Sequence, residues 1–165
     1  MRAEADAFGE GPIERWEPQR LDLCTRVFEE AMRLYPPIML FPRRSLEEVE
    51  IAGVRLPRRT LTFVSVVAQH RRPEVWPEPD RFDPDRFLPE RVRARPKGSY
   101  LPFSTGPRVC IGQHFAMMEG PIVLATLLRR WRFDIDPGRT IDEDDFATLR
   151  PRGGVPAVVR ARPGT

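Results

Sequence analysis

One cysteine of the chain stands where the sequence suits metal binding. Cys110 lies in the segment FSTGPRVCIG, directly before a run that we expect to be helical. Free N–H groups and the dipole at a helix start favour a thiolate and hold it as a metal ligand. Gly106 and Gly112 allow tight turns and a flat surface beside the sulfur, and Phe103 can shield it from water. A single axial thiolate ligand of a haem iron needs these properties, although the cysteine taken alone is more typical of a buried structural residue.

A second candidate is a pair of opposite charges. Glu30 and Arg33 are three residues apart, so they share a face of an expected helix over residues 19–35. Glu30 borders the apolar arc of that helix, where desolvation strengthens an ion pair. The spacing alone is also typical of a solvated surface pair that contributes roughly a few tenths of a kcal/mol.

The cysteine count limits other chemistries. Cys24 and Cys110 are the only cysteines, too few for a disulfide-stapled scaffold or a four-cysteine zinc site. We expect Cys24 to be a packing residue, because it lies on the apolar arc of the first helix. A reducing compartment is favoured.

Three segments together resemble the cytochrome P-450 family of haem-thiolate monooxygenases. FSTGPRVCIG matches all five marked positions of the family signature F-x-x-G-x-R-x-C-x-G. Glu30-Ala-Met-Arg33, followed by LYPP, resembles the E-x-x-R helix. WPEPDRFDPDRF resembles the family's meander, with the P-x-R-F core at residues 84–87. Their order and spacing agree with the family, and the resemblance covers residues from about 20 to the end.

The resemblance implies a role for each matching residue. Cys110 would be the metal ligand of haem b (iron protoporphyrin IX), and no catalytic residue beyond this ligand is implied. Arg108 and Arg43 would bind the haem propionates, with Arg44 as the near alternative to Arg43. The implied cofactor-binding residues are Phe103, Gly106, Arg108, Cys110, Gly112 and Arg43. The implied structural network that locks the meander is Glu30, Arg33 and Arg86.

Two histidines have less certain implications. His70, in AQHRRPEVW, resembles a recurrent His-Arg turn of the family. A packing or surface role and a haem contact both remain open for it. His114 lies in the first turn of the second helical run, and we expect it to be a surface or packing residue.

The elements that must position these residues can be predicted from pattern. Apolar spacing indicates the helix over 19–35, and β-branched residues indicate a hairpin at 49–51 that turns at Ala52-Gly53, then a more buried strand over 61–67. Seven prolines over residues 70–102 leave a meander with one short helical turn, and its Trp76, Phe82 and Phe87 should dock on a core.

The last third is expected to hold a helix and a hairpin. Residues 112–131 are apolar nearly all round the helix axis, which predicts burial on most sides. Gly120-Pro121 should bend or split that helix. Runs at 146–149 and 155–159 suggest a closing hairpin.

The expected fold is mainly α with small β-sheets (α+β), the carboxy-terminal portion of the P-450 fold. It contains the E-x-x-R helix, β hairpins, meander, cysteine-ligand loop and buried proximal helix. Residues 1–18 are expected to be a ragged or severed segment, and 19–165 an incomplete haem-binding domain. The family's oxygen-activating helix and substrate roof have no counterpart before residue 20.

Composition excludes several other classes. The 165 residues carry a net charge of +3, with no apolar run near 18 residues and no hydrophobic signal core. We therefore expect no membrane span in this chain and a cytoplasmic location, although upstream sequence with a membrane anchor is compatible with the resemblance. Lys97 is the only lysine among 27 basic residues. This arginine bias raises nucleic-acid binding as an alternative, but the arginines are dispersed among 24 acids and no nucleic-acid motif is present.

The expected function follows from the resemblance. The parent would insert one oxygen atom from O₂ into a small hydrophobic organic substrate, while this chain alone would be inactive. Alternatives are a haem-binding or sensor fragment without oxygenase activity, and an inactive truncated gene product. The expected electron donor is a ferredoxin or a flavoprotein reductase. An acidic donor would be attracted by these basic residues: Arg91, Arg93, Arg95, Lys97, Arg129 and Arg130.

Overall fold

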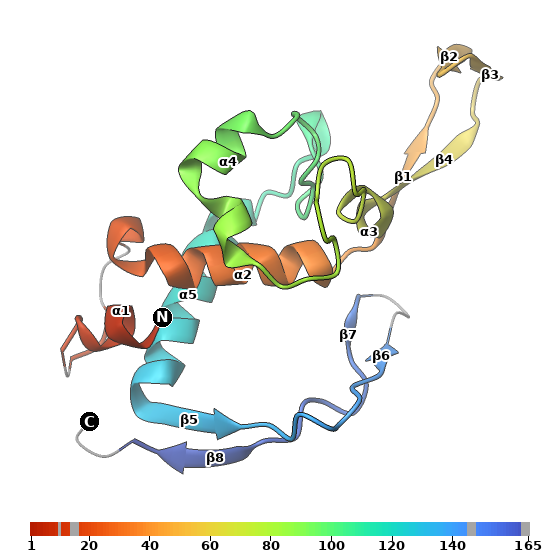
Figure 1. Ribbon diagram of the computed structural model, residues 1–165. Coiled ribbons are helices and arrows are strands. Elements are labelled where there is room, and N and C mark those ends of the chain that lie inside the picture. Colours follow the sequence, from red (N-terminus) through yellow and green to blue (C-terminus); the bar gives the residue numbers. More distant parts are fainter. Residues whose placement is uncertain (10, 14–16, 145–147, 163–165) are drawn as a thin grey trace.

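Two helices cross at the centre of the computed structural model, which describes residues 1–9, 11–13, 17–144 and 148–162. They are α2 (Asp22–Leu34) and α5 (Gln113–Arg130) (Figure 1). A methyl group placed on Gly120 of α5 would lie only 2.5 Å from the ring of Phe28 on α2. Glycine at this position therefore lets the two helices approach each other closely.

The first predicted helix is confirmed with slightly different bounds. A 3₁₀ turn, η1 (Pro18–Leu21), leads into α2, which ends at Leu34. The next residues are Tyr35 and the Pro36-Pro37 pair, whose first member is fully buried. Proline cannot continue the hydrogen-bond pattern of a helix, which explains the end of α2.

The amino-terminal residues are more ordered than the expected ragged segment. Residues 2–6 form the short helix α1 (Arg2–Asp6), and Ala5 is fully buried in the core beside Cys24 and Ala125. Both carboxylate oxygens of Glu4 accept hydrogen bonds from N–H groups at the start of α2, from Leu23 at 2.7 Å and Cys24 at 3.0 Å. A five-residue helix is too short to show periodicity in a sequence, and Glu4 and Ala5 join it to distant parts of the chain.

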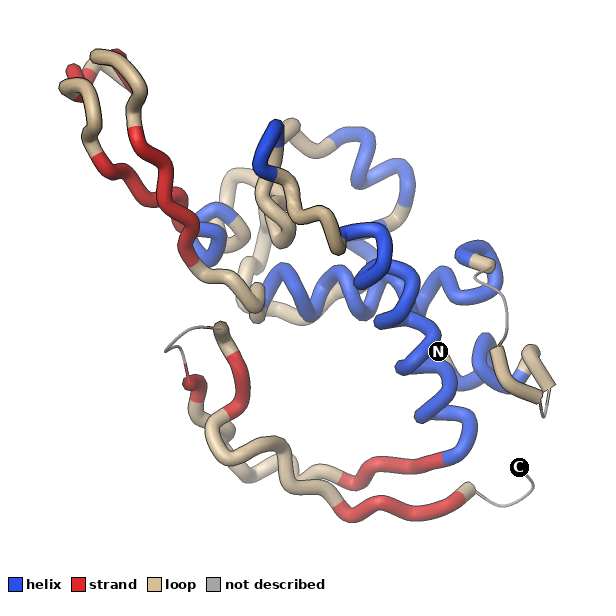
Figure 2. The backbone as a smooth tube through the Cα atoms, turned by 180° about the vertical axis from the view of Figure 1, so that it is seen from behind, coloured by secondary structure: helices blue, strands red, loops and turns tan. Residues whose placement is uncertain are grey.

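A β arm projects from the helices (Figures 1 and 2). At the base of the arm, β1 (Leu40–Arg44) pairs with β4 (Leu61–Ser65) in antiparallel fashion. Leu40 lies opposite Ser65, and Arg44 lies opposite Leu61. Its tip is the predicted hairpin, β2 (Val49–Ile51) and β3 (Val54–Leu56). The turn residues Ala52 and Gly53 both have positive φ, 51° and 78°, as a two-residue hairpin turn requires.

Two details of this arm differ from the prediction. β1 was not expected, because its Pro42 argues against a strand; the two-stranded pairing tolerates a proline since both strands are edges. The strand predicted over 61–67 ends at Ser65. The Ser65 hydroxyl accepts a hydrogen bond from the Ala68 N–H at 3.1 Å and begins α3 (Val66–Gln69). β4 is also less buried than expected, with Leu61 and Phe63 exposed.

The proline-rich meander is ordered and docked. It contains a 3₁₀ turn, η2 (Pro84–Phe87), and a short helix, α4 (Pro89–Ala94). Trp76 and Phe87 are buried, which confirms the docking prediction for these two aromatic residues. The prediction is wrong for Phe82, whose side chain is 47% exposed.

α5 runs unbroken through Gly120-Pro121, so of the predicted bend or split, the split does not occur. A proline clashes with the Cβ of the residue before it when that residue is helical, and Gly120 has no Cβ. The prediction of burial on most sides is also wrong for this chain. Phe115, Val123 and Leu127 are exposed, whereas the buried residues of α5 are Pro121, Ala125 and Arg129.

Two nested strand pairs follow α5. β5 (Trp131–Asp134) pairs with β8 (Val158–Ala161), and β6 (Glu143–Asp144) pairs with β7 (Arg150–Pro151), both antiparallel. The hairpin expected between 146–149 and 155–159 is wrong in its pairing, because β7 pairs with β6 and β8 pairs with β5. Residues 146 and 147 of the first expected strand lie outside the described residues.

The described residues form helices and four two-stranded sheets, the expected combination of mainly α structure with small β-sheets. In this described part of the chain, no helix combines the length and apolarity needed to cross a membrane.

Candidate metal centre

The segment that carries Cys110 is a loop closed by its own backbone. The Cys110 N–H donates to the Phe103 carbonyl at 2.9 Å, and the Val109 N–H donates to the Gly106 carbonyl at 3.0 Å. Gly106 begins the 3₁₀ turn η3 (Gly106–Arg108) with a φ of +69°, a conformation that favours glycine. These bonds place Phe103 and Cys110 together at the base of the loop.

The Cys110 side chain is exposed, three residues before α5 begins. Gly112 is the last residue before this helix, and a Cβ there would meet the Cys110 sulfur at 3.8 Å. This is ordinary van der Waals distance, so a methyl group there would fit in contact with the sulfur. Glycine leaves the space beside the sulfur open, as the sequence suggested.

Cys110 lines a cavity of about 320 Å³ with a mainly apolar wall. The cavity lies where the end of α2, strand β1 and the cysteine loop meet. Its lining residues are Met32, Pro37, Ile38, Phe41, Pro102, Phe103, Ser104, Arg108 and Cys110. The structure therefore brings together three of the predicted residues, and adds apolar neighbours that no sequence motif identified.

Arg43 also reaches the cysteine loop. Its guanidinium donates to the Ser104 hydroxyl at 2.8 Å and lies over the Phe41 ring, 4.6 Å from the ring centre. Residues alternate along β1, so Phe41 and Arg43 share its half-buried face while Arg44 is exposed on the other. Between the two candidates from the sequence, Arg43 is the one placed beside the loop.

The charged pair on α2 is fully buried and forms the expected network. Glu30 and Arg33 are 0% exposed and share two hydrogen bonds, at 2.7 and 2.9 Å. Arg86 of the meander lies 3.4 Å from Glu30 and donates to the Glu78 carbonyl at 2.8 Å. Glu30 further accepts the Asp83 N–H at 2.9 Å. The network therefore joins α2 to η2, and these residues do not line the cysteine cavity.

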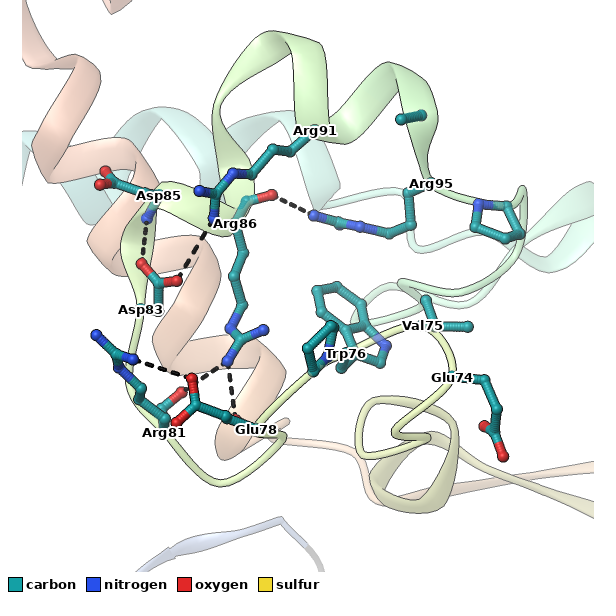
Figure 3. A pocket seen from close by; sticks show the side chains of 13 residues that line it. Glu74, Val75, Trp76, Glu78, Arg81, Asp83, Asp85, Arg86, Arg91 and Arg95 are labelled. Atoms are coloured by element: carbon teal, nitrogen blue, oxygen red, sulfur yellow. Dashed lines mark hydrogen bonds and ion pairs between the residues drawn. The ribbon is translucent and has the colours of Figure 1, made fainter.

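A second cavity, of about 740 Å³, lies beside the meander (Figure 3). Two ion pairs lie in its wall: Arg81 pairs with Glu78 at 3.0 Å, and Arg91 pairs with Asp83 at 3.5 Å. Arg95 stacks 4.1 Å above Trp76. This hollow is part of the structural frame of the meander and lies apart from Cys110.

The histidines and Cys24 have non-ligating positions. His70 is fully buried and both of its ring nitrogens are hydrogen-bonded to backbone groups, so the structure favours the packing role over a haem contact. His114 is exposed at the start of α5. Burial, together with the neighbouring Glu4 carboxylate, raises the pKa of the Cys24 thiol to about 12. Cys24 is therefore a neutral core residue.

The predicted basic surface is smaller than expected. Arg129 is buried and donates to the Gly9 carbonyl at 2.8 Å, and Arg95 is half-buried against aromatic rings. Arg129 is therefore closed to a partner protein, and Arg95 is only partly exposed. Arg91, Arg93, Lys97 and Arg130 remain exposed.

The residues around Cys110 fit a haem. Among the described residues, no group of three or more His, Cys, Asp or Glu side chains is arranged to hold a metal ion. The exposed thiol instead adjoins an apolar wall, with Arg108 on the cavity and Arg43 on the loop. This setting suits a metal that arrives in a flat organic ring with apolar faces and carboxylate substituents.

A model of the family described as Cytochrome P450 matches residues 5–155. The chain belongs to the cytochrome P450 family. It is 44% identical over 142 residues to cyclooctatin synthase of Streptomyces melanosporofaciens, an alignment covering 86% of this chain and 31% of the relative. It is 37% identical over 147 residues to pentalenene oxygenase of Streptomyces avermitilis, covering 88% and 33%. The chain thus spans about a third of the length of these curated relatives.

Solved structures of the family share the fold. The cytochrome P450DA haem domain superposes with a TM-score of 0.88 at 26% identity, covering 98% of this chain and 36% of that structure. The structure of CYP102L1 gives a TM-score of 0.85 at 28% identity, covering 98% and 37%. The described elements are therefore arranged as in these cytochromes P450.

Proposed function

We propose that the Cys110 thiolate is the fifth ligand of a haem b iron in a cytochrome P450 monooxygenase. The parent activity inserts one oxygen atom from O₂ into a small hydrophobic organic substrate. The observation that carries the proposal is an exposed thiol on an apolar cavity whose rim holds a guanidinium group. Family membership supports the class of reaction.

The chain's residues would divide the binding between them. The bound haem would supply oxygen activation, which thiolate ligation favours by increasing electron density on the metal. Arg108 and Arg43 would each bind a propionate, because a guanidinium fork can bond both carboxylate oxygens. Phe103 would shield the sulfur from water, and Gly112 would leave room beside it. Glu30, Arg33 and Arg86 would hold the meander without touching the cofactor.

The ligand assignment is tested with the two cysteines as a matched pair. Haem is added to the purified 165-residue chain, which is then reduced under carbon monoxide. Cys24→Ser should retain the thiolate-type absorption band, because Cys24 is enclosed in the core. Cys110→Ser should lose it. A band that survives in the Cys110 variant would overturn the assignment.

We further propose that the 165-residue chain alone has no monooxygenase activity. The chain spans about a third of its relatives, and a haem held at Cys110 needs a second wall to bury its other face. The chain is supplied with haem, a reductase, O₂ and a panel of hydrophobic substrates. Coupled product formation would contradict this part of the proposal.

The proposed electron donor is a ferredoxin or flavoprotein reductase that binds the exposed basic side chains of α4 and of the loop after it. Arg93 and Lys97 are free of the contacts that engage Arg95. Reversing both charges in the haem-loaded protein should slow reduction at low salt and have little effect at high salt. Arg55→Glu, on the β arm, is the matched control. Equal rates for all variants at both salts would refute this donor surface.

A further inference from the structure

His70 is held by hydrogen bonds from both sides of its ring. It is 0% exposed, and its Nε2 accepts a hydrogen bond from the Leu101 N–H at 2.7 Å. Because a backbone N–H can only donate, Nε2 carries no hydrogen. The ring hydrogen is therefore on Nδ1, which lies 3.2 Å from the Arg33 carbonyl and donates to it. One tautomer satisfies both contacts.

These contacts join the buried charge network to the cysteine loop. The Arg33 guanidinium donates back to the His70 carbonyl at 2.9 Å, so the two residues are bonded reciprocally. On the other side, Leu101 is two residues before Phe103, whose carbonyl accepts the Cys110 N–H at 2.9 Å. A continuous path runs from Glu30 through Arg33 and His70 to the backbone that holds Cys110.

The surroundings keep the ring fixed and neutral. The Tyr100 ring is stacked on it, with centres 5.1 Å apart, and Trp76 meets it edge-on at 6.3 Å. Burial lowers the pKa of His70 to about 4, with a further lowering by the cations Arg33, Arg71 and Arg95. Nε2 therefore stays available as an acceptor at neutral pH.

We propose that His70 is a positioning residue for the metal ligand: its Nε2 fixes the Leu101 backbone, and thereby the start of the loop that presents Cys110. The part of this statement that concerns metal ligation rests on the proposed function. The fixing of the loop does not.

The test separates the two hydrogen bonds of the ring. In His70→Gln, the side-chain amide can still accept from the Leu101 N–H but is poorly placed to donate to the Arg33 carbonyl. In His70→Asn, the shorter side chain can reach the Arg33 carbonyl but not Leu101. His70→Phe keeps the ring stacking and removes both bonds. Comparing Gln with Asn separates loss of the Leu101 bond from general loss of packing.

Amide hydrogen exchange is measured at Leu101 and Cys110 in the full chain. We expect exchange at Leu101 to be roughly tenfold faster in the Asn and Phe variants than in Gln, with a smaller acceleration at Cys110. Equal exchange in the Asn and Gln variants, or an unprotected Leu101 amide in the unsubstituted chain, would overturn the proposal.

Haem-loaded samples give the second readout. The thiolate-type band of the carbon monoxide complex should weaken in Asn and Phe and persist in Gln. If the unsubstituted chain forms no such band while the exchange pattern holds, the proposed haem ligation fails and the positioning by His70 stands. An unchanged band in all variants would show that the Leu101 bond does not position Cys110.

Discussion

The two helices at the centre of the molecule have opposite surroundings. α2 buries charged side chains: Glu30 and Arg33 are 0% exposed, enclosed by the meander and by residue 70. α5 instead exposes apolar side chains: Phe115 is 60% exposed, and Val123 and Leu127 are also open to solvent. Composition would suggest the opposite arrangement, since charges usually face water and apolar groups the core.

The contrast shows where each helix finds its partners. The partners of α2 come from the same 165 residues, through the meander. The chain spans about a third of its relatives, so we expect the open face of α5 to be a surface that the rest of a cytochrome P450 fold covers. The α2 region should therefore respond strongly to substitution in this chain, and the open face of α5 weakly.

The largest expected effect is at the buried charges. Glu30→Gln removes the anion that faces Arg33 and Arg86, leaving two cations without a counter-charge. The free energy of unfolding, measured with urea, should fall by about 3–5 kcal/mol. The matched change Glu17→Gln removes the exposed pair with Arg20 and should cost about 1 kcal/mol or less. A similar fall in the free energy of unfolding for both variants would show that the charges of the α2 network are not shielded from water.

Acid should weaken the same region through His70. Its pKa is lowered by burial from 6.5 to about 4, so the unfolded chain binds a proton that the folded chain does not. Stability from this group is complete above pH 6.5 and is lost as the pH falls toward 4. Relative to His70→Gln, which does not titrate, the unsubstituted chain should lose up to about 3 kcal/mol over that range. A constant difference would contradict the buried, neutral ring.

Glu29 provides a control with the opposite sign. Burial raises its pKa from 4.5 to about 7, so the folded chain holds a proton that the unfolded chain releases. Its contribution is complete below pH 4.5 and is lost as the pH rises through 7. Urea titrations of Glu29→Gln should therefore diverge from the unsubstituted chain at alkaline pH, in favour of the variant.

The helix crossing should show an intermediate effect. Gly120→Ala places a methyl group within 3 Å of the Phe28 ring, so the ring must shift or the helices must separate. A net loss of about 1–3 kcal/mol is expected, even though alanine favours a helix by up to about 1 kcal/mol over glycine. Phe28→Leu in the same molecule should restore part of the loss. A stabilised single variant would show that the crossing is loose.

The smallest effect on stability is expected on the open face of α5. Phe115→Gln and Leu127→Gln should each change the free energy of unfolding by about 0.5 kcal/mol or less. They should nevertheless reduce self-association, measured by sedimentation, because they shrink an exposed apolar surface. Ala125→Gln, on the buried face, is the control that should unfold readily. Losses above about 2 kcal/mol for the first two would show that this face is already packed.

Local pattern predicted some of these features and missed others for identifiable reasons. The apolar arc and Pro36-Pro37 predicted the position of α2 closely, and the Ala52-Gly53 turn predicted the hairpin of β2 and β3. The spacing of Glu30 and Arg33 could not reveal their burial, because the enclosing residues, such as His70 and Asp83, are 37 and 53 positions away from the residues they bind. The family resemblance supplied that long-range information.

The candidate site divides in the same way. Cys110 and Arg108 were predicted from the signature, and strand alternation places Arg43, and not Arg44, on the half-buried face of β1. The hydroxyl of Ser104, which binds Arg43, had no signal, since it occupies an unspecified position of the signature. Phe41 was missed together with β1, because Pro42 hid the strand.

The bonds from Glu4 to the start of α2 have a practical consequence for dissecting this protein. The first turn of a helix has N–H groups without intrahelical acceptors, and here two of them use a carboxylate nineteen and twenty positions upstream. A recombinant version that begins at the first residue of the E-x-x-R helix would contain every motif and still lose this cap. Expression boundaries and fusion junctions are therefore best placed before residue 2, so that the helix that bears Glu30 and Arg33 keeps both of its ends.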